Sequence, residues 1–309
     1  MATLLFTHPA CLRHDPSPGH PESPARLAAI LAALDEPEFA TLIRREAPRA
    51  EHAWIERAHP AAFVEGLLDV VPKSGYAAID GDTILSPDSG EAALRAAGAL
   101  CAAVDAIMVG EGANAFCAVR PPGHHAEPSR AMGFCLFNNV AIGALHARAV
   151  HGCERVAVID FDVHHGNGTQ TMFERDANLF FASTHQSPLY PGTGRASERG
   201  VGNIVNVPLR PGSGSVEFRR AMSDTIVPAL TAFRPDFILI SAGFDAHQDD
   251  PLAGLNFTDE DFAWATREIL SVARSHCAGR VVSTLEGGYD LDAVASSASA
   301  HVRELMRGN

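Results

Sequence analysis

Short apolar runs and longer amphipathic stretches alternate along the chain, and this pattern predicts a parallel α/β sheet. The apolar runs, which suit strands buried on both faces, cover residues 4–7, 115–119, 156–159, 179–184, 204–207, 237–241 and 281–284. Helices are predicted at 24–34, 88–108, 138–150, 215–233, 259–276 and 291–306. Strands that alternate with helices require right-handed crossovers, so we expect a mostly parallel sheet with helices on both faces. No repeat or linker interrupts the pattern, which favours a single domain over 1–309.

The most informative stretch begins at Val156 and reads Val-Ala-Val-Ile-Asp-Phe-Asp-Val-His-His. Polar residues that can bind metal start at Asp160, directly after the apolar strand, where ligands collect in parallel α/β sheets. On extended backbone Asp160, Asp162 and His164 point the same way. Carboxylate and imidazole groups suit Zn²⁺, which keeps an open position when about three protein groups bind it. A structural ion pair is the alternative for such a cluster.

Three further strand ends carry polar residues of unusual kinds. His124 and His125 follow one strand, Asp245 follows another, and Tyr289 follows a Gly-Gly pair that lets the backbone approach a ligand closely. Asp245 is the candidate third zinc ligand, a histidine the candidate general base, and Tyr289 a candidate hydrogen-bond donor to an oxyanion. Each motif alone is more often structural. Their convergence on one edge of the sheet predicts a metal-assisted amide hydrolase.

The overall composition narrows the function further. A net charge of −13, with no cluster of Lys or Arg, disfavours direct nucleic-acid binding and suits a cationic substrate. The six cysteines include no Cys-x-x-Cys pair, which argues against a disulfide framework or a thiolate zinc site. With no signal peptide and no long apolar stretch, we expect a cytoplasmic protein that does not span a membrane.

From the segment at 20–26 to that at 285–289, the motifs resemble those of the zinc-dependent histone deacetylase and acetylpolyamine amidohydrolase superfamily, in particular its class II branch and bacterial relatives. The resemblance implies a single catalytic domain with an arginase-like α/β fold and an eight-stranded, mostly parallel sheet. It also implies one Zn²⁺ per chain, bound by Asp162, His164 and Asp245. The implied reaction is hydrolysis of the acyl amide of an acylated lysine or a small acylated amine.

The resemblance implies roles for residues around the zinc. His125 would be the general base and acid and His124 mainly electrostatic, with Asp160 orienting His124 and Asn167 placed behind His125. Class I members usually carry Asp at the position of Asn167, so this residue favours a class II-like interpretation. Weakly active class IIa enzymes carry His where this chain has Tyr289, so we expect a competent deacetylase.

Substrate and cation sites are implied in the same way. Phe134 and Tyr190 would line the acyl-chain tunnel, and the whole substrate-binding set is Gly133, Phe134, Tyr190, Leu252 and Gly287. A monovalent-cation site for K⁺ would be formed, partly through backbone carbonyls, by Asp160, Ser183 and Thr184. Arg26 matches an interior arginine beside the cavity through which the released acid leaves.

Several alternatives stay open at the level of the sequence. The main one is an acetylpolyamine amidohydrolase. Leu252 stands where the eukaryotic polyamine-specific member has Glu, which argues against polyamine recognition through such a Glu. It does not argue against recognition through loop and dimer contacts, as in bacterial members. A binuclear manganese ureohydrolase is a less favoured hypothesis, because His247 lies two residues after Asp245, the spacing at which such enzymes carry a further metal ligand. A non-catalytic acyl-lysine binder is disfavoured by the intact histidine pair and tyrosine. Substrate preference should lie in the rim loops 13–20, 73–82 and 186–202, and a homo-oligomer is left open.

Overall fold

The computed structural model describes residues 2–308 and contains the expected sheet. Eight strands lie in the order β2-β1-β5-β10-β9-β6-β7-β8, and every neighbouring pair is parallel. The strands are β1 (Thr3–Thr7), β2 (Ile43–Glu46), β5 (Asn114–Cys117), β6 (Val156–Asp160), β7 (Leu179–Gln186), β8 (Ile204–Leu209), β9 (Phe237–Ala242) and β10 (Val281–Leu285). A separate antiparallel pair is formed by β3 (Ala77–Ala78) and β4 (Ile84–Leu85).

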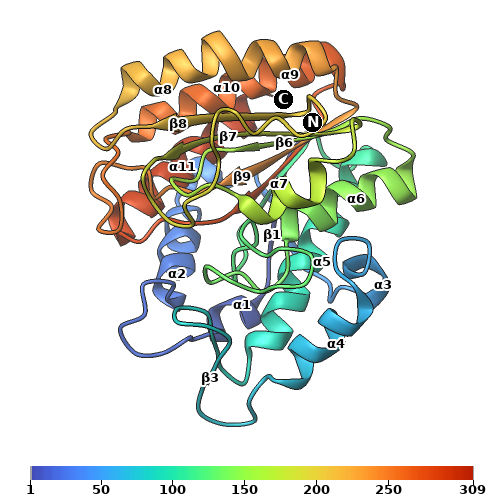
Figure 1. Cartoon of the computed structure of the whole chain (residues 1–309), viewed down its shortest axis with the longest axis vertical. Coiled ribbons are helices and arrows are strands. Elements are labelled where there is room, and N and C mark those ends of the chain that lie inside the picture. The colour runs from blue at the N-terminus through green and yellow to red at the C-terminus, as the bar shows by residue number, and fades with distance from the viewer. Residues whose placement is uncertain (1, 309) are drawn as a thin grey trace.

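Helices cover both faces of the sheet, as the alternating pattern predicts. Figure 1 shows α8, α9 and α10 on one side of the sheet and α5, α6 and α7 on the other. The helices are α1 (Pro9–Arg13), α2 (Pro24–Ala33), α3 (His52–Ile55), α4 (Ala61–Asp69), α5 (Ser89–Met108), α6 (Asn139–His151), α7 (Asn167–Phe173), α8 (Ser215–Ala221), α9 (Val227–Phe233), α10 (Asp259–His276) and α11 (Leu291–Arg307). Among residues 2–308, no helix has the length and apolar character needed to cross a membrane. All six cysteines are free and buried.

Two of the differences from the predicted elements have a clear cause in the sequence. The eighth strand, β2, was not predicted because all of its residues, Ile-Arg-Arg-Glu, are exposed at the edge of the sheet and carry no apolar pattern. The single helix predicted over 215–233 is divided by a π-helical turn at Met222–Ile226. Pro228 follows this turn and has no N–H to continue the α-helical bonding, which accounts for the change of register.

The order of the central strands explains where the site forms. Strands β5, β10, β9 and β6 are neighbours, so the four loops that follow them meet at one edge of the sheet. These are the loops in which the sequence places ligand-type residues after apolar runs. The strand β6 is buried along its whole length, which holds the start of its loop in a rigid setting. The predicted convergence is confirmed.

Helix α5 packs unusually closely against the segment that precedes α3. A Cβ atom on Gly98 would lie 2.0 Å from the carbonyl oxygen of Pro48 and 2.9 Å from the amide nitrogen of Ala50. The N–H of Ala50 also donates to the carbonyl of Leu94 at 2.9 Å, so the backbone of this segment is in direct contact with the backbone of α5. Only glycine fits at this point of the helix.

We expect Gly98→Ala to lower the free energy of unfolding by about 1–3 kcal/mol, because the backbone must shift to admit the methyl group. Gly66 is the matched control, since it is exposed in α4 and an added Cβ meets nothing within 4 Å. Gly66→Ala should be neutral or stabilising by up to about 1 kcal/mol, because alanine has the higher helix propensity. Urea unfolding measures both, and equal stability of the two variants would contradict the close packing.

Candidate active site and metal centre

The loops after β5, β6, β9 and β10 surround a cavity of about 170 Å³. Its lining residues are Asp82, Pro122, His124, His125, Gly133, Phe134, His164, Tyr190, Leu252, Gly287 and Tyr289. The cavity therefore brings together the whole predicted substrate-binding set, the histidine pair and Tyr289. Asp82 lies in the turn between β3 and β4 and was predicted only as part of a rim loop.

Asp162, His164 and Asp245 form a compact trio at the base of these loops. His164 Nδ1 lies 3.0 Å from Asp162 Oδ1 and 3.1 Å from Asp245 Oδ2, and the three ligand atoms lie within 4.8 Å of one another. Burial lowers the pKa of His164, but hydrogen bonds to the two carboxylates have the larger combined effect and raise this pKa to about 10. Two carboxylates and one imidazole suit Zn²⁺ with an open coordination position.

Backbone groups hold the two carboxylates in place. The N–H of Gly287 donates to Asp162 Oδ2 at 2.8 Å, and the N–H of Val163 donates to Asp245 Oδ1 at 2.9 Å. The other oxygen of each carboxylate is turned toward the ring of His164, and that of Asp162 also accepts the N–H of His164 at 2.8 Å. A Cβ on Gly243 would lie 2.0 Å from Asp162 Oδ2, and one on Gly287 would lie 2.0 Å from Asp245 Oδ2. The glycines leave a cradle that side chains would fill, which fits a bound ion.

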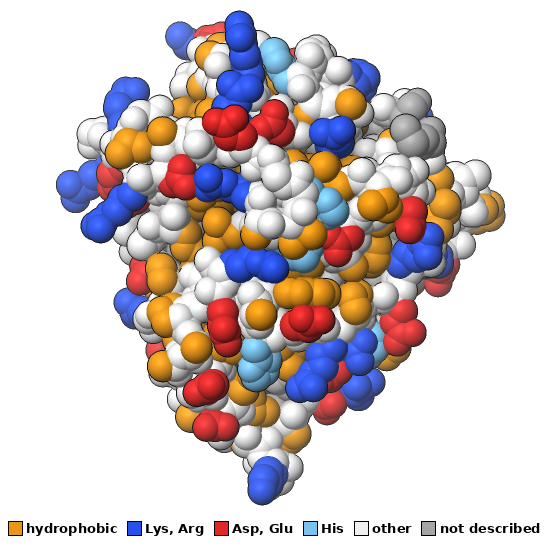
Figure 2. Space-filling model, turned by 90° about the vertical axis from the view of Figure 1, so that its right-hand side faces the viewer, with side chains coloured by type: hydrophobic (Ala, Val, Ile, Leu, Met, Phe, Trp, Pro, Cys, Tyr) orange, Lys and Arg blue, Asp and Glu red, His pale blue; other side chains and the backbone are white. Residues whose placement is uncertain are grey.

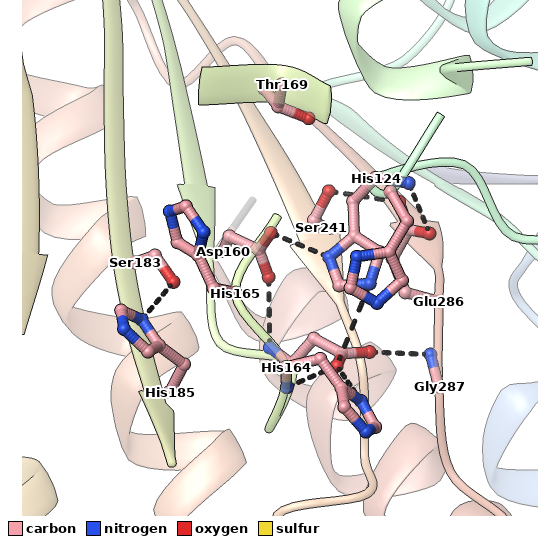
Figure 3. A network of polar contacts seen from close by, with 12 residues as sticks. His124, Asp160, His164, His165, Thr169, Ser183, His185, Ser241, Glu286 and Gly287 are labelled. Atoms are coloured by element: carbon pink, nitrogen blue, oxygen red, sulfur yellow. Dashed lines mark hydrogen bonds and ion pairs between the residues drawn. The ribbon is translucent and has the colours of Figure 1, made fainter. Parts of the chain in front are cut away.

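Asp160 is not a member of the trio, although its carboxylate and that of Asp162 both face the ring of His124, at 2.9 and 3.8 Å. Asp160 Oδ1 accepts the N–H of Asp162 at 3.1 Å, and Oδ2 lies 2.9 Å from Nδ1 of His124, as Figure 3 shows. Asp160 therefore lies where it can orient His124, the role that the resemblance implies.

His125 is held as a base by a chain of two hydrogen bonds. Asn167 Nδ2 donates to Glu127 Oε1 at 2.8 Å, which turns the amide oxygen of Asn167 toward His125. Nδ1–H of His125 then donates to this oxygen at 2.8 Å, so Nε2 carries the lone pair. Burial lowers the pKa of His125 well below 6.5, and the neighbouring His124 and His164 lower it further. His125 is therefore neutral at neutral pH.

His124 differs from its neighbour in charge. Burial lowers its pKa, but the carboxylates of Asp162, Asp160 and Glu286 raise it well above 6.5. The two imidazole rings lie 4.1 Å apart between centroids, so a cationic ring stands beside a neutral one. This arrangement suits an electrostatic role for His124 and a proton-accepting role for His125.

Glu286 is a buried residue of the site that the sequence analysis missed. Its carboxylate accepts the N–H groups of Gly123 and His124, at 2.6 and 3.2 Å, and the hydroxyl of Ser241 at 3.0 Å. It thereby ties together the ends of β5, β9 and β10 (Figure 3). The available signal was an acidic residue directly after the strand segment that ends at Leu285, the same pattern that singled out Asp160.

Tyr289 lies at the cavity wall with its ring beneath the guanidinium of Arg26, 4.8 Å from the ring centroid. Burial raises the pKa of the Tyr289 phenol well above 10, so the hydroxyl keeps its proton. Asp250, which the sequence analysis did not single out, accepts the N–H of Tyr289 at 2.8 Å and that of Leu252 at 2.9 Å. Asp250 therefore joins the loop that carries Tyr289 to the rim that carries Leu252.

A second oxygen-rich point lies beside Asp160, where β6 and β7 pair Asp160 with Ser183. His185 Nε2 donates to the carbonyl of Gly194 at 2.9 Å, so its Nδ1 accepts the hydroxyl proton of Ser183 at 2.9 Å. The lone pairs of Ser183 Oγ are left for another partner. The hydroxyl of Thr184 is buried and makes no hydrogen bond within residues 2–308. The oxygens of Asp160 and Ser183 fit the chemistry of a hard monovalent cation, whereas the hydroxyl of Thr184, the next residue of β7, points to the other face of the sheet.

Two histidines near the motifs lie outside the trio. His165 bonds Gln170 at 2.9 Å and Thr193 at 2.7 Å, and so anchors the loop that carries Tyr190. Nδ1 of His247 accepts the N–H of Asp249 at 3.2 Å, and its Nε2 lies 3.7 Å from Asp259. Within the described chain, His247 does not join Asp162, His164 and Asp245, which removes the observation that favoured a binuclear site.

Comparisons with known proteins bear on the family and the fold of the chain. The family profile described as "Histone deacetylase domain" matches residues 20–305. Histone deacetylase 14, chloroplastic, of Arabidopsis thaliana is 41% identical over 99% of this chain and 77% of its own. A histone deacetylase-like amidohydrolase of Pseudomonas aeruginosa is 40% identical over 93% of this chain and 77% of its own. The solved structure described as "Crystal Structure of HDA15 HD domain" superimposes with a TM-score of 0.93 at 34% identity, covering 99% of this chain and 88% of that one.

The pH dependence of acetyl-lysine peptide turnover tests the environment of His125. Because its pKa lies below 6.5, the neutral form persists as the pH falls, and the acid limb of kcat/KM should lie below pH 6.5. A carboxylate at Nδ1 stabilises the protonated ring, so Asn167→Asp combined with Glu127→Gln should move this limb upward by about 1–3 pH units. Glu127→Gln alone is the control and should move it little. An unmoved limb in the double variant would show that His125 is not the titrating base.

Proposed function

We propose, from the premise that the chain belongs to the histone deacetylase family, that it is a zinc-dependent deacetylase. It would hydrolyse the acyl amide of acetyl-lysine side chains or of small acetylated amines to a free amine and a carboxylate. One observation carries the proposal: His164, which belongs to the trio with Asp162 and Asp245, lines the same narrow cavity as His125 and Tyr289. Relatives of this family that are named deacetylase or amidohydrolase support the proposal.

The shape and charge of the cavity suit an acylated primary amine. Phe134 and Tyr190 contribute aromatic rings to a cavity of about 170 Å³, which has room for an alkyl chain with its amide. Asp82 adds a carboxylate to the wall, and the net charge of −13 favours the approach of cationic substrates. Leu252 is half-exposed at the rim and offers no charge of its own. Both a lysine side chain and a small polyamine satisfy these features.

Each residue of the site has a separate role in amide hydrolysis. Zinc bound by Asp162, His164 and Asp245 would polarise the substrate carbonyl and make an attacking water more acidic. His125 Nε2 takes the proton of the attacking water and later gives a proton to the leaving amine. The Tyr289 hydroxyl donates a hydrogen bond to the oxyanion as it forms. The charged His124, held by Asp160, stabilises the negative charge that develops nearby.

We propose a cytoplasmic location for the protein. Its six cysteines are buried and free, which suits a reducing compartment. Two of the relatives, from Arabidopsis thaliana and Oryza sativa, are described as chloroplastic.

Tyr289→Phe should lower kcat by about 10²–10³, or about 2.7–4 kcal/mol, because one donor to the oxyanion is lost. Bound zinc should stay unchanged, since the hydroxyl is not a member of the trio. Tyr190→Phe makes the same chemical change at the partly exposed rim and should alter kcat little. The assay uses an acetyl-lysine peptide and an acetylated polyamine, and kcat/KM for the two decides between the lysine and polyamine activities. Near wild-type turnover by Tyr289→Phe would overturn this mechanism.

The oxygens of Asp160 and Ser183 lead us to propose a K⁺ site formed, partly through backbone carbonyls, by Asp160, Ser183 and Thr184. Replacing K⁺ in the buffer by a large organic cation should lower turnover, because the carboxylate that orients His124 loses its counter-ion. Ser183→Ala should raise the K⁺ concentration for half-maximal activity by about tenfold. Titration of activity with KCl measures this, and an identical response of wild type and variant would exclude the site.

A further inference from the structure

A second cluster of metal-ligating side chains lies away from the active site, where α5 and α6 end side by side (Figure 1). Its members are Asp105 near the end of α5 and His146 and His151 in the last turns of α6. Nε2 of His146 and Nε2 of His151 lie 2.7 and 2.6 Å from the same oxygen, Oδ1 of Asp105. None of the four loops of the active-site cavity contributes to the cluster.

The cluster is preformed and can be reached from solvent. The side chain of His146 is 3% exposed, that of His151 17% and that of Asp105 41%. Its helices are fixed by their own packing, since α6 contacts α5 and the short α3. Figure 2 shows the right-hand side of Figure 1, where α6 and α3 lie: acidic and basic side chains are interspersed there, and several histidines reach the surface. An ion could therefore enter without unfolding the helices.

Hydrogen bonds in the cluster define which protons an ion would replace. Arg57 Nη1 lies 2.8 Å from Nδ1 of His146, and because arginine only donates, this nitrogen must accept. The ring proton of His146 is therefore on Nε2 and is donated to Asp105. The Nε2–H of His151 is donated to the same oxygen. Two N–H groups thus converge on one carboxylate, and a divalent ion bound to the same three atoms would take the place of these two protons.

We propose that Asp105, His146 and His151 form a second metal site, selective for divalent transition ions such as Zn²⁺ or Ni²⁺. Two imidazole nitrogens and one carboxylate oxygen are a preferred donor set for these ions, and the exposed side of Asp105 leaves positions for water. Around Zn²⁺ such atoms lie about 3.3 Å apart, so the helices need only a small adjustment from the present spacing. The ion would link the ends of α5 and α6.

Arg57 sets the affinity of this site. A metal on Nε2 places the ring proton of His146 on Nδ1, where it meets the donor group of Arg57 instead of an acceptor. Histidine ligands are normally strengthened by an acceptor at the second nitrogen. The hydrogen bond between Arg57 and His146 must therefore break when the metal binds. The affinity is then lower than that of the same three ligands with a hydrogen-bond acceptor at Nδ1 of His146. Replacing Arg57 by Gln, whose carbonyl can accept this proton, should tighten binding.

Tryptophan fluorescence provides a direct test. The Trp54 ring lies 5.4 Å from the ring of His146, and the only other tryptophan, Trp264, packs against Phe218 between α10 and α8. In the Trp264→Phe background, loaded with only one equivalent of Zn²⁺ per chain so that the weaker second site stays free, titration with Ni²⁺ should quench Trp54 saturably at one equivalent. His151→Ala and Asp105→Asn should each weaken this binding at least tenfold, whereas Arg57→Gln should tighten it about tenfold.

Outcomes of the titration separate the possibilities. Saturable quenching that both ligand variants weaken supports the site even if one of them is less stable, because Asp105→Asn keeps the hydrogen-bond acceptor. No quenching of Trp54 up to millimolar Ni²⁺ would overturn the proposal. Equal quenching in wild type and both ligand variants would also overturn it, since the ion would then bind elsewhere. None of these results depends on the proposed deacetylase activity.

Discussion

Buried negative charge at the carboxyl ends of the central strands is the constraint on which the rest of the structure depends. Four carboxylates are at most 1% exposed there: Asp160, Asp162, Asp245 and Glu286. Such burial is costly unless charges and hydrogen-bond donors offset it. Imidazoles and backbone N–H groups provide part of the offset. Even so, burial raises the pKa of Asp160 to about 7 and raises that of Glu286 and Asp245. The imidazoles and N–H groups of the chain therefore do not offset all of the negative charge of these four carboxylates, and bound cations would balance the rest.

Much of the surrounding architecture follows from holding these carboxylates in place. The strands β5, β10, β9 and β6 must be neighbours for their loops to meet, and the sheet order makes them so. Gly243 and Gly287 must lack side chains because a Cβ would occupy the space of the carboxylate oxygens. Glu286 then joins three strand ends through one side chain. The site and the centre of the sheet are therefore stabilised by the same contacts.

The sequence predicted those parts that burial determines. Strands covered on both faces leave continuous apolar runs, and the residue types directly after them identified the trio, the histidine pair and Tyr289. The edge strand β2 left no such trace, because its residues are exposed. Glu286 and Asp250 were missed as partners because their contacts reach residues 163 and 39 positions away, which no local pattern reveals.

The central claim is that Asp162, His164 and Asp245 hold one zinc ion at the cavity. Anomalous diffraction at the zinc absorption edge, from crystals of the zinc-loaded protein, tests this most directly. The account predicts one strong peak between these three side chains, facing His125 and Tyr289. An empty map at this point, or two peaks about 3.5–4 Å apart as in binuclear sites, would contradict it.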